Sequence, residues 1–409
     1  MWPRIRFDIG WWDLAYGLWA CAAARDRDHW QRAVESLWSA DGGALACHSV
    51  RGGFDLLLSS LALPRGSEVL FSALNVKGMI KIARRHGLVP VPVDLDPDTM
   101  GPRPDALRRA IGPRSRVLVV AHLFGCRLDL EAVLSLAEEH ELFVVEDCAQ
   151  AFAGLGYRGH PRANVSAFSF GPLKTASALG GALLQVRDPH VLDAMRELQA
   201  VQPAQPRAAQ LARVLKFAAL KILTTPPVLG AVARAFRLRA AGGSAATGRD
   251  YEDTVTDAVR GVARLGGARQ QQLRPSAPLL ALLRRRLRRF RTEVLVERAR
   301  TGEKLARALG EAVSRPARKN PLHSYWVFPV LVEDPGAVIA ALRARGFDAA
   351  TLPRSQTVKA PADRPELDPE SARSVLARLV ILPCHPRMPD SELEREARTL
   401  RELAARRPT

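Results

Sequence analysis

Between residues 48 and 186 the chain alternates short apolar runs with amphipathic stretches, and this alternation limits its fold more than any other feature. The apolar runs typical of buried strands are 68–73, 88–96, 116–125 and 142–147. The helical patterns between them are 76–87, 104–111 and 130–141. Strands and helices that alternate at this spacing form a parallel sheet with helices on both faces. We therefore expect an α/β fold that binds its ligand beyond the carboxyl ends of the strands.

Two residues at the end of this pattern have the chemistry of a cofactor site. Asp147 closes the apolar run FVVED, and Lys174 follows 27 positions later among small residues, just after FSF. A lysine in apolar surroundings loses hydration, so the pKa of its ammonium falls and its amine can attack a carbonyl. A carboxylate at a strand end can hold a proton on a heteroaromatic nitrogen. Pyridoxal phosphate needs both groups, although a capping Asp and a solvated Lys are the commoner roles of such residues.

Other residues could supply the remaining contacts of the same cofactor. Gly52 and Gly53 follow Arg51 at the expected start of a helix, where free backbone N–H groups and a positive charge suit a phosphate. Ser169, five residues before Lys174, offers a second phosphate donor. Gln150, three residues after Asp147, could hydrogen-bond the phenolic oxygen of the ring.

On these motifs the sequence resembles the DegT/StrS-type family of pyridoxal-phosphate-dependent sugar aminotransferases. The segments that carry the resemblance are RGSEVLFSA, LVPVPVDLD, AHLFG, VVEDCAQAF, FSFGPLK with GGALL, and LPCHPRMPDSELE. They cover residues 45–190 densely and 320–400 loosely. The resemblance implies a fold-type I enzyme with a large, mainly parallel-sheet domain, a smaller C-terminal α+β domain, and a homodimer with shared active sites. The chain resembles a divergent member of this family, as the substitutions described below indicate.

By position, the resemblance assigns roles to individual residues. It implies that Lys174 is the Schiff-base lysine and Asp147 the partner of the pyridinium, the two catalytic residues. The cofactor-binding set that it implies is Arg51, Gly52, Val76, Asp147, Gln150, Ser169, Lys174 and Gln272. On the HSYW run, His323, Tyr325 and Trp326 are candidates for lining the substrate site, and core packing of Tyr325 and Trp326 is an equal alternative.

The activity that the resemblance implies is transfer of an amino group, with glutamate as donor and a nucleotide-linked keto-sugar as acceptor. Products of this kind enter polysaccharide or secondary-metabolite biosynthesis. Retention of Lys174 favours transamination, because related dehydratases of the family carry histidine there. Two alternatives stay open: a fold-type I enzyme that acts on a non-sugar ketone, and a membrane-associated family member without turnover.

Several positions depart from the family pattern. The ring-stacking aromatic residue of the family falls at Val76, and a β-branched side chain cannot supply aromatic stacking. Ser-Val-Arg replaces the family's Ser-Gly-Thr or Ser-Gly-Arg at 49–51. The asparagine that partner subunits donate near the phosphate corresponds to Gln272. These differences point to an unusual acceptor.

The chain of 409 residues is long enough for more than one domain. We expect an N-terminal helical arm over 1–40, a cofactor-binding domain over 41–260, and a long helix with a small domain over 261–409. In the last part the patterns predict one helix over 279–309, a strand over 323–332, a helix over 335–346, a strand over 375–383 and a terminal helix over 391–407.

The charge and the cysteine content limit the cellular compartment and the classes of binding partner that we expect. The net charge is +18, and residues 201–300 hold 20 Lys plus Arg against 6 Asp plus Glu. A basic surface suits a phosphorylated substrate, anionic lipid or nucleic acid; nucleic acid is the weakest of these because no recognition motif accompanies the charge. Five dispersed cysteines without a CxxC pair argue against disulfides and a metal site and favour the cytoplasm.

The segment 200–260 is longer and more basic than is usual in the family, and Pro226 and Pro227 divide it. A packed helical hairpin or lid is the simpler interpretation. The alternative is peripheral contact with an anionic membrane through 207–240, at the inner face of the membrane. The cations that would face the headgroups are Lys216, Lys221, Arg234 and Arg237. No clean signal peptide and no uncharged apolar run of spanning length are apparent in the sequence.

Overall fold

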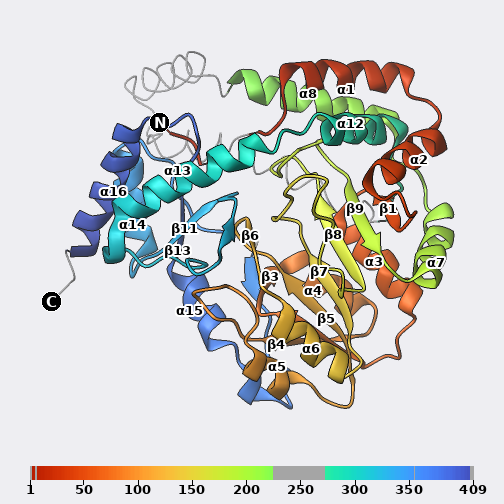
Figure 1. Cartoon of the computed structure of the whole chain (residues 1–409), viewed down its shortest axis with the longest axis horizontal. Coiled ribbons are helices and arrows are strands. Elements are labelled where there is room, and N and C mark those ends of the chain that lie inside the picture. The colour runs from red at the N-terminus through yellow and green to blue at the C-terminus, as the bar shows by residue number, and fades with distance from the viewer. Residues whose placement is uncertain (1, 5–6, 224–271, 354, 406–409) are drawn as a thin grey trace, which may run out of the picture.

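The computed structural model describes residues 2–4, 7–223, 272–353 and 355–405. Its centre is a seven-stranded sheet that helices cover on both faces (Figure 1). In spatial order the strands are β1 (Ala44–Cys47), β9 (Ala182–Val186), β8 (Val165–Ser169), β7 (Phe143–Asp147), β5 (Ser115–Ala121), β2 (Glu68–Ser72) and β4 (Val89–Val93). The five strands from β8 to β4 pair in parallel, whereas β9 is antiparallel to both of its neighbours. The predicted α/β class with a mainly parallel sheet is confirmed.

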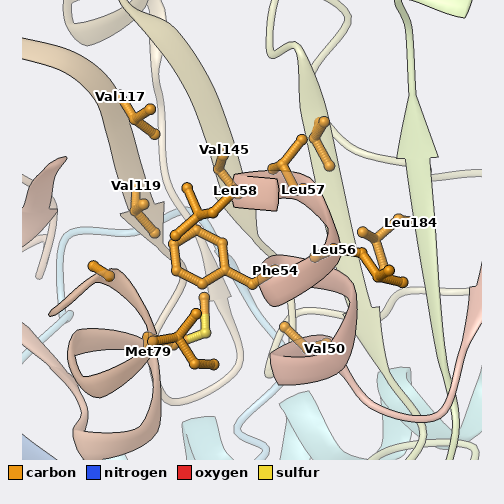
Figure 2. Close-up of a cluster of buried hydrophobic side chains, with 14 of the residues drawn as sticks. Val50, Phe54, Leu56, Leu57, Leu58, Met79, Val117, Val119, Val145 and Leu184 are labelled. Atoms are coloured by element: carbon orange, nitrogen blue, oxygen red, sulfur yellow. The ribbon is translucent and has the colours of Figure 1, made fainter. Parts of the chain in front are cut away.

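One face of the sheet packs against α3 (Val50–Leu61), α4 (Lys77–Arg85) and α7 (Pro189–Ala200). Figure 2 shows Phe54, Leu57 and Leu58 of α3 directed at valines of the central strands, beside Met79 of α4. These apolar residues recur at helical spacing, so α3 presents a continuous stripe to the sheet. The resulting core holds the start of α3, and with it Arg51, against the sheet.

The opposite face is covered in two parts. Over the parallel strands lie α5 (Pro104–Ala110) and α6 (Glu131–Glu139), which bury Leu107 and Leu134 against the sheet. Over β1, β9 and β8 lies a helical layer in which Trp38 packs 4.9 Å from Phe168. This layer consists of α1 (Trp11–Ala23), α2 (Arg27–Trp38), α8 (Arg207–Leu223) and α12 (Ala277–Arg288). The cores on the two faces bury the middle of the sheet completely.

The C-terminal part packs around α13 (Glu293–Leu309) and α16 (Asp390–Ala405) (Figure 1). Its antiparallel pair is β11 (Phe328–Leu331) with β13 (Leu379–Leu382). Two short pairs connect it with the sheet domain: β10 (Leu322–His323) with β6 (Cys126–Arg127), and β12 (Ser355–Thr357) with β3 (Leu74–Val76). The remaining elements are η1 (Gly310–Ala312), α14 (Pro335–Ala344), η2 (Pro365–Leu367) and α15 (Glu370–Arg378).

Three of the predicted C-terminal elements were wrong in extent. The expected helix 279–309 is two helices, α12 and α13, because the chain turns at Arg289 and places Phe290 5.0 Å from Phe152 in the core. The expected strand 323–332 is two strands, β10 and β11, separated by Tyr325 with φ 44°. The first half of 375–383 is the end of α15 and only its second half is a strand. The helices expected at 335–346 and 391–407 are present as α14 and α16.

All five cysteines are free thiols, and three of them are buried. Among the described residues, no helix combines the length and the apolar character that crossing a bilayer requires. Of the segment 200–260, the structure describes α8 and the residues before it, so Arg234, Arg237 and the proline pair lie outside the described residues. The proposed division at 40 and 260 stays a prediction.

Candidate functional site

The candidate site begins where two neighbouring parallel strands end. Asp147 is the last residue of β7 and pairs with Ala167, and β8 ends two residues later at Ser169. The chain then forms a turn in which the Lys174 N–H donates to Gly171 O at 3.0 Å. A Cβ placed on Gly171 would lie 3.7 Å from Ser169 Oγ and 3.9 Å from Lys174 Cγ. The structure therefore brings Asp147, Ser169 and Lys174 to one edge of the sheet, as the α/β topology predicts.

Lys174 has the electrostatics of an amine that reacts near neutral pH. Loss of hydration lowers the pKa of Lys174 to about 8, and the negative charge of Asp147 opposes this only in part. Its Nζ lies 4.2 Å from the centre of the Trp326 ring. The ring covers one side of the ammonium. The lowered pKa gives Lys174 a larger share of free amine near neutral pH than an exposed lysine has.

Asp147 is buried, and burial raises the pKa of its carboxyl group above the usual value. The Ala149 N–H, which donates to Asp147 Oδ1 at 2.9 Å, and the positive charge of Lys174 oppose that rise. Oδ2 accepts no hydrogen bond from any residue in the described ranges. One carboxylate oxygen is thus still able to accept a hydrogen bond from a bound group.

Arg51 lies between the beginnings of two helices. It is the second residue of α3, whose N-cap Ser49 accepts a hydrogen bond from the Gly52 N–H at 3.1 Å. A Cβ on Gly78, in the first turn of α4, would lie 2.6 Å from Arg51 Cδ, so only glycine leaves room there. Burial lowers the pKa of the Arg51 guanidinium, and the described residues supply it with no hydrogen bond or ion pair. A desolvated cation beside two helix N-termini is suited to an anion.

The loop around Lys174, residues 173–181, is held by groups that are distant in sequence. The Ala176 N–H donates to Asp8 Oδ2 at 2.6 Å, and Trp326 Nε1 donates to Leu173 O at 2.9 Å. Two arginines hold the next part of the loop: Arg286 Nε donates to Ser177 O at 3.0 Å, and Arg298 Nη1 donates to Thr175 Oγ1 at 3.2 Å.

The end of the loop is held in the same way. Arg213 Nη1 donates to Leu179 O, and the Gly181 N–H donates to His48 O. These contacts fix the loop that carries Lys174. The contact between Gly181 and His48 joins this loop to the turn before α3, where Arg51 lies.

The two other predicted contacts near the ring lie close to these elements. Gln150 Oε1 accepts a hydrogen bond from the Phe124 N–H at 2.8 Å, which leaves its amide NH₂ group able to donate elsewhere. Val76 is half-buried, precedes α4 and pairs with Ser355 of β12. Beside it, Asn75 is buried, and its Nδ2 has no hydrogen-bond partner among the described residues. Sequence reasoning did not find Asn75 because only the pairing of β3 with β12 buries it.

Gln272 is the one predicted cofactor residue that lies apart from this group. It is exposed, two residues before Arg274, which forms an isolated bridge with Ala204. It makes no hydrogen bond with any residue that the structure describes. A residue that serves the site of a second subunit would be exposed in this way, and its assignment stays a prediction.

The three predicted substrate residues take different positions. Trp326 contacts Lys174 and its loop, as described above. The ring of His323 stacks on Tyr325 at 4.0 Å, and burial lowers the pKa of His323 to about 4, so its imidazole is neutral. Tyr325 also stacks on Phe328 at 5.5 Å and packs against Gly302, where a Cβ would meet its ring at 2.3 Å. Core packing therefore explains the position of Tyr325. Trp326, by contrast, lies at the candidate site, because its ring contacts Lys174.

A buried network beside Asp147 was not predicted. Glu146 accepts hydrogen bonds from Tyr157 Oη at 2.6 Å, Ser166 Oγ at 2.6 Å and the His160 N–H at 2.7 Å, and pairs with His122 Nε2 at 2.8 Å. Burial by itself would raise the pKa of Glu146, but His122 and the hydroxyls lower it below its usual value. His122, Glu146 and Cys148 have ligand atoms within 4.8 Å of one another. Because the carboxylate is already saturated with hydrogen bonds, we interpret the network as a structural support for β7.

The donor set fits pyridoxal phosphate. An amine with a lowered pKa, a buried carboxylate with a free oxygen, and an unpaired guanidinium at helix N-termini match its aldehyde, its ring nitrogen and its phosphate, respectively. Each of the three groups is desolvated without a full set of partners from the chain. Such groups cost free energy unless a ligand satisfies them.

Comparison with known proteins gives an independent result. Residues 30–219 match the model of the DegT/DnrJ/EryC1/StrS aminotransferase family. A relative from Micromonospora echinospora, named L-glutamine:2-deoxy-scyllo-inosose aminotransferase, is 36% identical over 131 residues, which are 31% of this chain and 31% of the relative. The match thus spans about a third of that relative's length.

Solved structures extend the likeness over the whole chain. The aminotransferase TlmJ from Streptoalloteichus hindustanus superposes with a TM-score of 0.69 and 18% identity, covering 99% of both chains. DesI, solved in the presence of its TDP-sugar product, gives a TM-score of 0.65 at 19% identity, covering 98% of this chain and 92% of DesI. At these identities the superpositions show the fold, which is the fold-type I architecture.

Proposed function

We propose that this chain, whose residues 30–219 match the model of the DegT/DnrJ/EryC1/StrS aminotransferase family, is a pyridoxal-phosphate-dependent aminotransferase of that family. It moves an amino group from an amino acid to a keto-sugar. The observation that carries the proposal is the half-buried Lys174, with its pKa lowered to about 8 by loss of hydration and its amine against the Trp326 ring, beside the strand end that holds Asp147.

The chain's own groups divide the chemistry between them. When bound, the cofactor would supply an electron sink for the donor carbon that loses a proton. Lys174 would hold the aldehyde, and its free amine could move a proton from the donor carbon to the cofactor as general base and then general acid. Asp147 would hold the proton on the ring nitrogen through its free oxygen. Arg51 and the starts of α3 and α4 would hold the phosphate, and Trp326 keeps water from one side of Lys174.

For the donor we propose glutamate, and for the acceptor a nucleotide-linked keto-sugar. The chain's excess of Arg and Lys suits a diphosphate, and DesI is described with a TDP-sugar product. The name of the Micromonospora relative specifies glutamine and a keto-inositol instead. Val76 in place of an aromatic residue is the specific observation that favours the alternative, an acceptor that is not a sugar.

Half-reactions separate these options. The purified holoenzyme would be mixed with glutamate or glutamine, and loss of its visible absorbance band would be followed. The aminated form would then be given a nucleotide keto-sugar, a keto-inositol or a simple ketone, and recovery of the band measured. Recovery with the nucleotide sugar alone supports the proposal, and recovery with a simple ketone alone supports the non-sugar alternative. A protein without any visible band would instead be the non-catalytic family member.

Assembly and location belong to the same proposal. We propose a homodimer in which Gln272 of each subunit completes the cofactor site of the other, in keeping with its exposed position. We propose a cytoplasmic enzyme, a location that free cysteines suit. Its product would enter polysaccharide or secondary-metabolite biosynthesis. Peripheral contact with an anionic membrane through 207–240 also remains a proposal, of which the described residues include only α8.

A further inference from the structure

The helices α1 and α8 form one antiparallel pair on the outside of the molecule (Figure 1). At one end Arg207 Nη2 donates to Cys21 O at 2.7 Å and to Ala22 O at 2.8 Å. At the other end Lys221 Nζ donates to Ile9 O. Between them, Gly17 allows close approach, because a Cβ there would lie 3.2 Å from Val214 Cγ2. The pair is therefore a fixed surface element, and we call its outer side the α1–α8 face.

The outward side of α1 consists only of apolar residues. Every exposed residue of this helix is Trp, Leu or Ala: Trp11, Trp12, Ala15, Leu18, Trp19, Ala22 and Ala23. Trp12 is 82% exposed and Trp19 is 51% exposed. The inner side is also apolar apart from Asp13, which pairs with Arg285 and Arg286. A helix that is apolar on all sides is normally buried on all sides, so α1 lacks a cover among the described residues.

The outward side of α8 continues the same surface. Between Ala208 and Ala219 each exposed residue is Ala or Leu, and Leu215 is 51% exposed. The stripe includes Lys216 at its centre and Arg207 at its start, and neither helix carries an exposed carboxylate. The α1–α8 face thus combines an apolar surface with exclusively positive charge.

We propose that the α1–α8 face lies on an anionic lipid surface, with the α1 tryptophans at headgroup level. Trp is the residue type that prefers the interface between headgroups and acyl chains, and an apolar face with a Lys- and Arg-containing border is typical of helices that lie in that plane. The α8 helix, at about 25 Å, would lie flat along the surface. Headgroup phosphates would neutralise Arg207 and Lys216.

A second copy of the chain is the less suitable occupant. Two copies that met through this face about a twofold axis would bring only cations into the interface, without a carboxylate on either helix to compensate them. Like charges in a desolvated interface oppose association, whereas an anionic bilayer supplies the missing charge. The proposal does not depend on the enzymatic activity, because no residue of the α1–α8 face belongs to the Lys174 site.

Vesicle co-sedimentation of the full-length holoprotein tests the proposal. The wild type should bind vesicles of phosphatidylcholine with phosphatidylglycerol, and bind pure phosphatidylcholine vesicles much less. Trp12→Glu and Leu215→Glu should each lower the partition coefficient ~10-fold or more, since each places a carboxylate in the apolar stripe. Lys216→Gln should lower it ~5-fold on anionic vesicles. The matched control is Val296→Glu, at a site 50% exposed on α13, which should bind as the wild type does.

Retention of the circular dichroism spectrum and of the cofactor band would show that each variant is folded. The proposal is overturned if the folded wild type does not bind anionic vesicles, or if Trp12→Glu binds them as well as the wild type. It is also overturned if Trp12→Glu, but not Val296→Glu, halves the molar mass measured by light scattering. That last outcome would assign the α1–α8 face to a second copy.

Discussion

At the scale of single residues, the chemistry of the candidate site follows from which groups are desolvated and which are left without partners. Asp147 and Lys174 could be predicted because a carboxylate at a strand end and a lysine among small residues are visible in the sequence. Trp326 could be named but not assigned, since only the structure places Lys174 Nζ against its ring. Asp8 could not be predicted, because it is 168 residues from Ala176, whose N–H it accepts.

The lowered pKa of Lys174 predicts how the apoprotein reacts with its cofactor. The free amine is the nucleophile, so the rate of band formation should rise with pH and level off above about 8, where Lys174 is deprotonated. Stopped-flow absorbance between pH 6 and 10 measures this. A rate that still rises up to pH 10 would mean that Lys174 keeps the ordinary lysine pKa of 10.5.

Asp147→Asn separates binding from turnover. The amide still fills the pocket but cannot hold a proton on the ring nitrogen, so the visible band should persist while turnover falls by about 10²-fold or more. Steady-state transamination and the absorbance spectrum of the same sample provide the two readouts. The control, Asp129→Asn, changes an exposed carboxylate and should retain full activity. Equal activity of the two variants would remove Asp147 from the proposed role.

At the scale of elements, two patterns predicted most of the sheet and its helices: the alternation of apolar runs with amphipathic stretches, and the helical spacing of apolar residues within those stretches. They could do so because each strand is buried and each helix has one apolar stripe. The break between α12 and α13 was missed, since 279–309 has a continuous helical pattern and only the packing of Phe290 on Phe152 ends α12. The short strand β12 was also missed, because Ser355–Thr357 has no apolar alternation and gains its pairing from β3.

The N-terminal helix is tied to α12 by a buried ion cluster. Asp13 accepts a hydrogen bond from Arg285 Nε at 2.9 Å and forms an ion pair with Arg286 Nη1 at 2.5 Å. Arg286 Nε also donates to Ser177 O, in the loop around Lys174. Asp13→Ala should lower the free energy of unfolding by about 3 kcal/mol, since it removes the carboxylate that Arg285 and Arg286 share and leaves Arg286 with Asp8 as its remaining ion pair. Urea denaturation measures the change. The control Asp28→Ala breaks an exposed pair with Arg27 and should cost at most about 1 kcal/mol.

The same cluster has a pH signature. Burial by itself would raise the pKa of Asp13, but Arg286 and Arg285 lower it below its ordinary value of 3.8. A lowered folded-state pKa stabilises the protein above the unfolded pKa, and the contribution is lost as the pH falls below that value. The difference in stability between wild type and Asp13→Ala should therefore be constant from pH 7 to 5 and shrink below pH 4. A difference that does not change with pH would contradict this account.

At the scale of the whole molecule, the fold could be predicted, whereas the outer surface could be predicted only in part. The EDCAQA and FSFGPLK motifs lie in the region that the family model matches. The sequence suggested membrane contact for the segment that contains α8, but it could not predict that α1 completes the α1–α8 face, because the two helices are separated by about 190 residues and pack together over α12. The proposed role of Gln272 requires a second subunit, because the residue is exposed on its own chain.

A shared site can be tested by mixing two defective proteins. Lys174→Ala and Gln272→Ala homodimers should both be weak at limiting cofactor. If sites are shared, subunit exchange creates hybrids in which one of the two sites has both native residues, and the mixture should recover about a quarter of wild-type activity. Activity of the mixture at limiting cofactor is the readout. No recovery, with exchange confirmed by mass spectrometry, would mean that each site is built from one chain.

The central claim is that Lys174 is the residue that binds pyridoxal phosphate. Borohydride reduction of the holoprotein, followed by proteolysis and mass spectrometry, tests it most directly. The account predicts a phosphopyridoxyl mass on the peptide containing Lys174 and on no other peptide, together with loss of that mass in Lys174→Ala. A modified Lys77 or Lys81 with an unmodified Lys174, or no modified peptide at all, would contradict it.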